Sequence, residues 1–148
     1  MRSCQYSENA DYISRCLELA ILFEVSGYPK PGNIHRTADF SETTFEHYLA
    51  SAVGIAPSFR KAAEQGIKFS NGEIEAPELG IGFVIKDAVN RMLSSQKGGN
   101  TLLGAIIILA PIAAAAGMID GKFSLVKLRK NIKLVVESTT PEDSIQTY

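Results

Sequence analysis

A long stretch without charged residues, from Gly98 to Ile119, constrains the fold of this chain more than any other feature. More than about 18 apolar residues in a row suffice to cross a bilayer as a helix. This stretch also contains Asn100, Thr101, Pro111 and four consecutive alanines, which make it weakly lipophilic for a single span. A helix that is apolar on all sides otherwise belongs in a protein core. We therefore expect the buried central helix of a helical domain.

Elsewhere, apolar residues recur every three or four positions, which is typical of amphipathic helices. The pattern predicts helices over residues 7–25, 41–56, 57–65, 77–94 and 100–118, and one that begins at Ser124 and has Leu125, Leu128, Ile132, Val135 and Val136 on its apolar face. A loop is expected from Gly66 to Gly72, with a turn at Asn71-Gly72. Thr140-Pro141-Glu142-Asp143 has the pattern of a helix start. Because no long run alternates β-branched with polar residues, the predicted fold class is all-α.

The composition limits the classes of function. Fifteen Lys and Arg against 16 Asp and Glu give a net charge of −1, so no overall basic field is present to attract nucleic acid. Cys4 and Cys16 have no metal-ligand spacing, and the N-terminus lacks a signal-peptide pattern. We expect reduced thiols and a cytoplasmic location. A basic run near the C-terminus is expected to be the solvated side of the last helix: Lys122, Lys127, Arg129, Lys130 and Lys133.

Three potential cations lie on the segment 29–36, which two prolines stiffen. They are Lys30, His35 and Arg36. Lysine offers a compact positive charge and arginine a two-pronged donor, the usual pair for phosphate oxygens. The segment therefore predicts a local anion site. The alternative is a solvated loop whose prolines only fix its path between two helices.

Gly98-Gly99-Asn100-Thr101 leads into the uncharged helix. Glycines let the backbone approach a ligand closely, and the first N–H groups of a helix have no partner within it. Asn100 and Thr101 can either cap the helix or hydrogen-bond a substrate. A polyphosphate suits this segment as well as the cationic loop, and we expect the two to face each other across a cleft.

Glu24 follows the apolar stripe of its helix and is expected on the buried face at the C-terminal end. Both burial and the helix dipole disfavour a carboxylate there, so a cation should lie nearby. Lys30, Arg36 or a divalent metal would serve. A structural ion pair and a catalytic carboxylate both remain open at this point.

Asp39, Glu46 and His47 form a polar cluster after the cationic loop. Asp39 could hold Mg²⁺ against a phosphate chain, since hard cations prefer carboxylate and phosphate oxygens, or it could cap the following helix. Glu46 and His47 lie opposite the apolar face of that helix, and we expect the histidine to be solvated.

The segment PKPGNIHR with Glu24 upstream, Asp39-Phe40 and Ser51 downstream, and the segment GGNTLLGAI together resemble the triphosphoribosyl-dephospho-CoA synthase family. The resemblance covers almost the whole chain and is strongest to archaeal-type members. It implies an all-α enzyme that transfers the 5-triphosphoribosyl group of ATP to a hydroxyl of 3′-dephospho-CoA or a related alcohol, with adenine leaving.

The resemblance also implies roles for particular residues. It assigns Mg²⁺ binding or proton acceptance to Glu24 and Asp39. It assigns phosphate or substrate binding to the following positions: Lys30, Gly32, His35, Arg36, Ser51, Gly99, Asn100 and Thr101. Among these, Lys30 and Arg36 would hold phosphates, and Asn100 and Thr101 would contact the nucleotide.

Family chains are nearly twice as long, so residues 1–148 are expected to form one helical domain that corresponds to the N-terminal half of a longer one. Leu102-Leu103 stand where bacterial members carry His-Lys, which leaves the acceptor open. The alternative to an enzyme is a non-catalytic helical module that keeps a phosphate pocket or a partner surface. A homo-oligomer that completes the core is a further expectation; nucleic-acid and membrane partners are not expected.

Overall fold

The structure is a computed structural model that describes the backbone of residues 2–147 and the side chains of residues 7–147. This part of the chain forms six α-helices and one short 3-10 helix, and it contains no β-strand. They are α1 (Arg2–Val25), α2 (Phe45–Ser70), η1 (Ala76–Leu79), α3 (Ile81–Ser95), α4 (Leu103–Gly117), α5 (Leu125–Glu137) and α6 (Pro141–Thr147). The predicted all-α fold class is confirmed.

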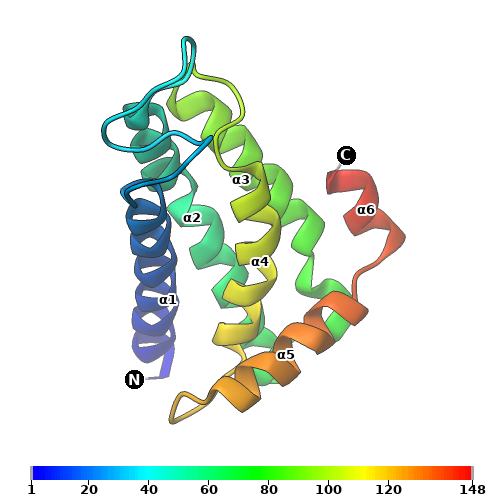
Figure 1. Cartoon of the computed structure of the whole chain (residues 1–148). Coiled ribbons are helices and arrows are strands. Elements are labelled where there is room, and N and C mark those ends of the chain that lie inside the picture. Colours follow the sequence, from blue (N-terminus) through cyan, green and yellow to red (C-terminus); the bar gives the residue numbers. More distant parts are fainter. Residues whose placement is uncertain (1, 148) are drawn as a thin grey trace.

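Helix α2 packs against α1, α3 and α4 (Figure 1). Its face toward the core includes Ala52, Ile55 and Phe59, all of them fully buried. The prediction of separate helices divided before Pro57 is wrong, since α2 runs through this position without interruption. Pro57 lies on the exposed side of α2, where water can replace the hydrogen bond that proline cannot make.

The prediction of a loop from Gly66 to Gly72 is also wrong for residues 66–70, because α2 continues to Ser70. Close packing between helices explains the glycine at position 66. A Cβ atom on Gly66 would lie 1.9 Å from the carbonyl oxygen of Ala114 in α4. A Cβ atom on Gly117 would likewise lie 2.1 Å from the carbonyl oxygen of Ala63 in α2. The glycines therefore permit the contact between α2 and α4. The turn predicted at Asn71-Gly72 is confirmed, with Gly72 at a φ of 72°.

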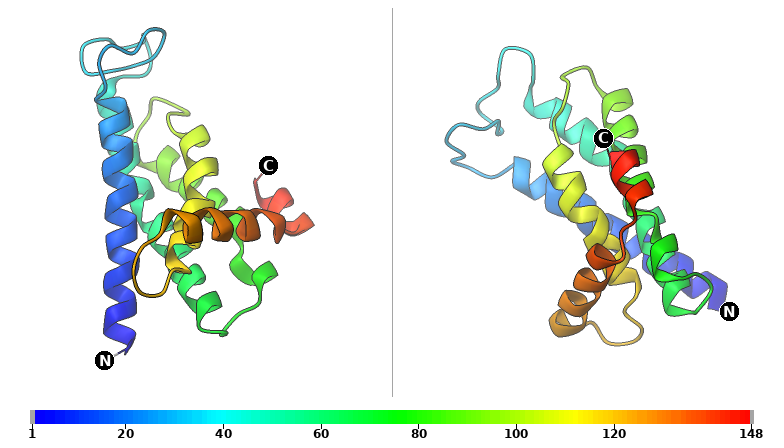
Figure 2. Two further views of the ribbon diagram at one scale, coloured as in Figure 1. Left: turned by 60° about the horizontal axis from the view of Figure 1, so that its bottom comes forward. Right: turned by 90° about the vertical axis from the view of Figure 1, so that its right-hand side faces the viewer.

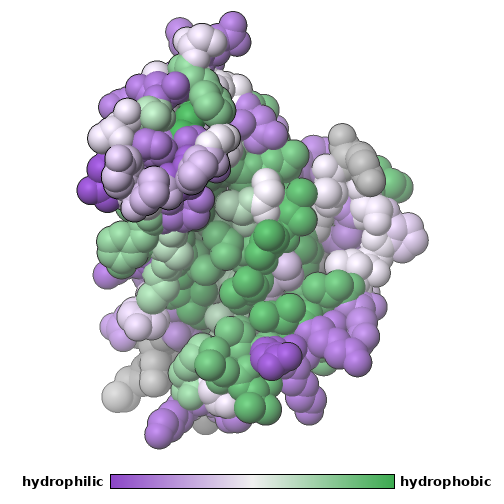
Figure 3. All heavy atoms as spheres, viewed as in Figure 1, coloured by the Kyte–Doolittle hydropathy of each residue, from purple (hydrophilic) through white to green (hydrophobic). Residues whose placement is uncertain are grey.

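One face of α4 is buried, and another is open to solvent. Ile106, Ala110 and Ala114 are fully buried, whereas Ile107 and Ile108 are 43% and 62% exposed. The structure thus differs from the expectation of burial on all sides. Apolar side chains gather on the open surface over α4 in Figure 3. Among the described residues, no helix is long and apolar enough to span a membrane.

Several helix boundaries follow from single residues. The helix predicted from Pro77 to Ser94 is divided by Gly80, which adopts a left-handed φ of 61° between η1 and α3. Ser124 caps α5 as predicted, because its Oγ accepts a hydrogen bond from the backbone N–H of Lys127.

The predicted apolar face of α5 is only partly covered. Val135 is buried, but Leu125 and Val136 are 68% and 52% exposed, because α5 packs mainly against α4. Cys16 is an exposed free thiol, and the side chain of Cys4 lies outside the described residues.

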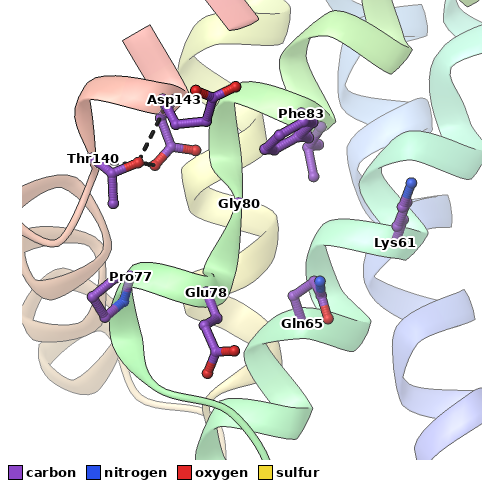
Figure 4. A pocket seen from close by; sticks show the side chains of 10 residues that line it. Lys61, Gln65, Pro77, Glu78, Gly80, Phe83, Thr140 and Asp143 are labelled. Carbon is purple, nitrogen blue, oxygen red and sulfur yellow. Dashed lines mark hydrogen bonds between the residues drawn. The ribbon is translucent and has the colours of Figure 1, made fainter. Parts of the chain in front are cut away.

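The last helix, α6, begins at Pro141 as the sequence predicted, and Asp143 fastens it to α3. Asp143 Oδ1 accepts a hydrogen bond of 2.8 Å from the backbone N–H of Gly82, and Oδ2 accepts bonds of 2.9 Å from the N–H and the hydroxyl of Thr140. Figure 4 shows Asp143 and Thr140 beside a pocket of about 490 Å³ between α2, η1, α3 and α6.

Asp143→Ala is expected to release α6 from α3. The change leaves the N–H groups of Gly82 and Thr140 without their acceptor, which should lower the free energy of unfolding by about 1–3 kcal/mol. Hydrogen exchange of residues 140–147 should also accelerate. Glu142→Ala is the matched control, because Glu142 is exposed and, among the described residues, its carboxylate accepts a hydrogen bond from the side chain of Gln146 on the same helix. Equal losses of stability in the two variants would contradict this role of Asp143.

Candidate functional site

The two segments singled out in the sequence lie at the same end of the helical bundle (Figure 1 and Figure 2). Residues 26–44 link α1 to α2, and residues 96–102 link α3 to α4. We call them the cationic loop and the glycine loop. They touch directly, because the hydroxyl of Thr43 donates a hydrogen bond of 2.8 Å to the carbonyl of Gly98. This contact joins the end of one loop to the other, while the expected cleft between residues 29–36 and 98–101 and its use as a ligand site stay predictions.

Lys30 in the cationic loop pairs with Glu24 in the last turn of α1, at 2.6 Å between Nζ and Oε1. A cation beside Glu24 was predicted and is confirmed. The expected burial of Glu24 is wrong, because its side chain is 57% exposed. The buried stripe of α1 ends on Ile21 and Val25, and Glu24 lies one position outside this stripe. An ammonium group has three donors, so the pair leaves Lys30 two for a ligand.

Arg36 fastens the cationic loop to α1 a second time. Its Nε donates to the carbonyl of Ser26 at 2.9 Å, and its Nη2 donates to the same oxygen. The guanidinium keeps further N–H groups for other acceptors. The loop therefore holds both predicted phosphate-binding cations close to the end of α1.

His35 and Gly32 shape the loop. The backbone of His35 exchanges hydrogen bonds of 3.1 and 3.0 Å with Ala38, and its ring contacts Tyr28 edge to face, with centroids 5.4 Å apart. Gly32 turns the chain at a φ of 76°. In the structure His35 makes contacts within the loop and Gly32 provides a turn, and the contact of both residues with a substrate stays a prediction.

Asp39 caps α2, which was one of its two predicted roles. Its Oδ1 accepts a hydrogen bond of 2.7 Å from the backbone N–H of Phe45, the first residue of the helix. In the same first turn, the backbone N–H of Glu46 and then the Thr44 hydroxyl lower the pKa of the Glu46 carboxyl. The N-terminus of α2 thus already attracts negative charge, as a helix dipole predicts.

The donor set for Mg²⁺ consists of exposed carboxylates. The described residues contain no group of three or more His, Cys, Asp or Glu side chains arranged to hold a metal. Glu24 and Asp39 are both exposed, and each binds a protein group through one oxygen. Mg²⁺ commonly keeps several waters and uses one or two carboxylates together with substrate phosphates. Single exposed carboxylates of this kind are compatible with a metal that arrives with a phosphate chain, and the Mg²⁺ site stays a prediction.

The glycine loop packs against the start of α2 through His47. A Cβ atom on the buried Gly98 would lie 2.4 Å from Nδ1 of the His47 ring, so glycine is required there. The same Nδ1 accepts a hydrogen bond of 3.1 Å from the backbone N–H of Thr44. The sequence interpretation of His47 as a solvated residue is therefore wrong, because this ring joins the helix cap to the glycine loop.

A second contact between the glycine loop and α2 joins two predicted site residues. The Thr101 hydroxyl donates a hydrogen bond of 2.7 Å to Ser51 Oγ, and Ser51 in turn donates one of 2.8 Å to the carbonyl of His47. Ser51 is fully buried. Asn100 Oδ1 accepts a bond of 3.1 Å from the N–H of Leu103 and so caps α4, while Gly99 turns the exposed chain at a φ of 74°.

Sequence reasoning missed Thr43 and Tyr48 as parts of this end of the molecule. Burial raises the pKa of the Tyr48 hydroxyl, and the nearby negative charge of Glu24 raises it further. For His47, its position three residues after Thr44 was the available signal, because a polar side chain there can close a capping box.

Gly98→Ala is expected to push the glycine loop away from the His47 ring. We expect the free energy of unfolding to fall by about 1–3 kcal/mol, as overpacking does elsewhere, and hydrogen exchange in residues 96–102 to accelerate. Thermal unfolding and exchange measurements test this. Gly104→Ala is the control, because nothing lies within 4 Å of a Cβ atom at that position. If Gly98→Ala kept wild-type stability and exchange, the assigned contact would be wrong.

Comparison with known proteins gives two matches. The family model described as ATP:dephospho-CoA triphosphoribosyl transferase matches residues 10–148, a range that contains all predicted site residues. A protein of Pseudomonas fluorescens (strain Pf0-1), described as a probable 2-(5''-triphosphoribosyl)-3'-dephosphocoenzyme-A synthase, is 32% identical over 102 residues. That match covers 67% of this chain and 34% of the relative, so the chain spans about a third of the relative's length. No solved structure matches.

Proposed function

Because the chain belongs to the ATP:dephospho-CoA triphosphoribosyl transferase family, we propose that it binds Mg-ATP between the cationic loop and the glycine loop. The bound nucleotide donates its 5-triphosphoribosyl group to a hydroxyl of 3′-dephospho-CoA or a related alcohol. The observation that carries the proposal is the contact of Thr43 with Gly98, which brings the loop of Lys30 and Arg36 to the loop of Asn100 and Thr101.

The triphosphate is held by positive charge and by backbone donors. Lys30 uses the two donors that its pair with Glu24 leaves, and Arg36 uses N–H groups not engaged by Ser26. The glycine loop supplies backbone N–H groups, and Gly99 in this loop is exposed. Donors fixed in advance by such contacts stabilise developing charge without reorganisation.

Asp39 and Glu24 have separate roles in the proposed reaction. Mg²⁺ supplies neutralisation of the triphosphate charge when bound, and Asp39 is the residue proposed to hold it. Glu24 accepts the proton of the acceptor hydroxyl while that oxygen bonds to C1′ of the ribose. The bond from C1′ to the adenine nitrogen breaks, and adenine leaves with the bonding electrons and takes up a proton. A nearby carboxylate also stabilises the positive charge that develops on the ribose.

Glu24→Gln is expected to slow adenine release by about 10²- to 10⁴-fold, the usual contribution of a general base. Affinity for Mg-ATP should stay within about twofold, because glutamine keeps an acceptor for Lys30 and loses only the charge. Chromatographic detection of adenine, with Mg-ATP and 3′-dephospho-CoA present, measures the rate, and calorimetry measures the affinity. Adenine release at the wild-type rate would remove Glu24 from the mechanism.

The alternative function is a non-catalytic module that binds Mg-ATP, and one observation favours it: the match covers 34% of the relative. The same two measurements on the unaltered chain separate the cases. A transferase binds Mg-ATP and releases adenine, whereas a module binds Mg-ATP and releases none. Absence of both binding and release would contradict both functions.

A further inference from the structure

The hydroxyl group of Ser51 in α2 lies between two oxygen atoms in the interior of the molecule. Ser51 is fully buried. Its Oγ is 2.8 Å from the carbonyl oxygen of His47 and 2.7 Å from the hydroxyl oxygen of Thr101 in the glycine loop. A serine hydroxyl has one proton, and a carbonyl oxygen can only accept a hydrogen bond. Ser51 therefore donates to His47, and Thr101 has to supply the proton of the second bond.

The direction of this hydrogen-bond chain decides what the Thr101 hydroxyl offers to a ligand. Because its one proton is engaged by Ser51, the hydroxyl oxygen can accept a further hydrogen bond but cannot donate one. The oxygens of a triphosphate are acceptors as well, so they are not partners for Thr101. The partner that fits this half-buried hydroxyl is an N–H or O–H group of the substrate.

The neighbouring residue, Asn100, offers the opposite character. Its Oδ1 accepts a hydrogen bond of 3.1 Å from the backbone N–H of Leu103. A backbone N–H can only donate, so the oxygen of the amide must face Leu103 and Nδ2 must face away from it. Asn100 is exposed, and Nδ2 has no hydrogen-bond partner among residues 7–147. The glycine loop thus carries a donor at position 100 directly beside an acceptor at position 101.

We propose that this pair reads the edge of adenine that carries the amino group. Thr101 Oγ1 accepts a hydrogen bond from the 6-amino group, and Asn100 Nδ2 donates one to N7. Adenine presents this donor and this acceptor side by side, whereas guanine and hypoxanthine have an oxygen acceptor in place of the amino group. That oxygen would face the lone pairs of Thr101. The inference rests on the proposed binding of Mg-ATP at the two loops and adds its specificity for the base.

Ser51 is a positioning residue for this recognition, because it is fully buried and acts on the base through Thr101. Without the Ser51 hydroxyl, the proton of Thr101 is free to turn outward. Thr101 can then donate a hydrogen bond to the 6-oxygen of hypoxanthine as readily as it accepts one from adenine. Removal of a hydroxyl that does not touch the ligand should therefore relax the specificity for the base.

Calorimetric titrations of the unaltered 148-residue chain test the inference first. The ligands are the magnesium complexes of ATP, inosine triphosphate and 7-deaza-ATP. All three carry the same ribose and triphosphate, so the cationic loop contributes equally to each affinity. We expect inosine triphosphate and 7-deaza-ATP to bind about tenfold more weakly than ATP, because each leaves one polar group of the pair without its partner.

Ser51→Ala tests the direction of the hydrogen-bond chain. The preference for ATP over inosine triphosphate should fall from about tenfold to about twofold or less. Ser58→Ala is the matched control, because Ser58 is also fully buried in α2 but donates its hydrogen bond to Asp87 in α3. It should keep the tenfold preference. The unfolding temperature of each variant checks its fold, and the ratio of two affinities is insensitive to the fraction of folded protein.

Two further variants address the residues that contact the base. Asn100→Asp keeps an acceptor for the N–H of Leu103 and removes the two donors, so the preference for ATP over 7-deaza-ATP should disappear. Any repulsion between the new carboxylate and the triphosphate weakens both ligands equally. Thr101→Ser keeps the hydroxyl and should retain most of the preference for ATP over inosine triphosphate, whereas Thr101→Val should lose it.

The possible failures are distinguishable. Equal affinities of the unaltered chain for ATP and inosine triphosphate would overturn the inference and leave the proposed function in place. A preference that survives in Ser51→Ala, or that Ser58→Ala lowers to the same extent, would also overturn it. Binding of none of the three nucleotides would overturn both the inference and the proposed function.

Discussion

Lys30→Ala is expected to weaken Mg-ATP binding by about 10- to 100-fold. Removal of a hydrogen bond that involves a charged group costs about 1.5–3 kcal/mol, and each 1.4 kcal/mol is tenfold in affinity. The change also leaves Glu24 without its partner, so a bare carboxylate would face the triphosphate. Both effects act in the same direction. Calorimetric titration of the purified variant with Mg-ATP measures the loss.

Two control variants separate this effect from a general change of charge. Lys30→Arg keeps the positive charge beside Glu24 and should retain part of the affinity, whereas Lys68→Ala removes an exposed lysine from the opposite end of α2 and should bind as wild type. Wild-type affinity in Lys30→Ala would mean that the cationic loop does not hold the nucleotide. Equal losses in Lys30→Ala and Lys68→Ala would mean that only net charge matters.

Gly66→Ala is expected to destabilise the fold more than any other single methyl group added to the helices. The new Cβ atom would lie 1.9 Å from the carbonyl oxygen of Ala114, and backbone on both helices fixes that separation. Overpacking costs about 1–3 kcal/mol, and more where the backbone must move, against a typical total stability of 5–15 kcal/mol. We expect a loss of about 3 kcal/mol or more, measured by denaturant unfolding.

Gly104→Ala in α4 makes the same chemical change with the opposite expected sign. Apart from the adjacent backbone of α4 itself, no atom of the described residues lies within 4 Å of a Cβ atom there, so alanine should stabilise the helix by about 0.5–1 kcal/mol. A variant Gly66→Ala that unfolds at the same denaturant concentration as Gly104→Ala would show that α2 and α4 do not cross as closely as described.

The helices could be predicted where a local pattern decides them. The start of α6 and the cap of α5 follow from residues within one turn, and both were correct. The continuity of α2 could not be predicted, because Pro57 and Gly66 are locally helix-breaking residues and only packing against the other helices overrides that preference. The open face of α4 could not be predicted either, since an apolar sequence does not indicate how many other helices pack around it.

In the candidate site, too, contacts between residues close in sequence could be predicted and contacts between distant residues could not. The pair of Glu24 with Lys30 and the cap made by Asp39 each span six residues of sequence, and reasoning from nearby charges and helix starts found both. The contact of Thr43 with Gly98 and that of Thr101 with Ser51 join residues 55 and 50 positions apart. No local sequence pattern encodes such contacts, so the contact between the two loops could be found only from the folded structure.

The most direct measurement is a titration of the isotope-labelled chain with Mg-ATP, followed residue by residue through its amide resonances. The account predicts that the largest shifts fall in residues 30–36 and 98–101, and that Lys30→Ala removes both sets together. Shifts confined to residues outside the two loops, or an unchanged spectrum at millimolar nucleotide, would contradict it.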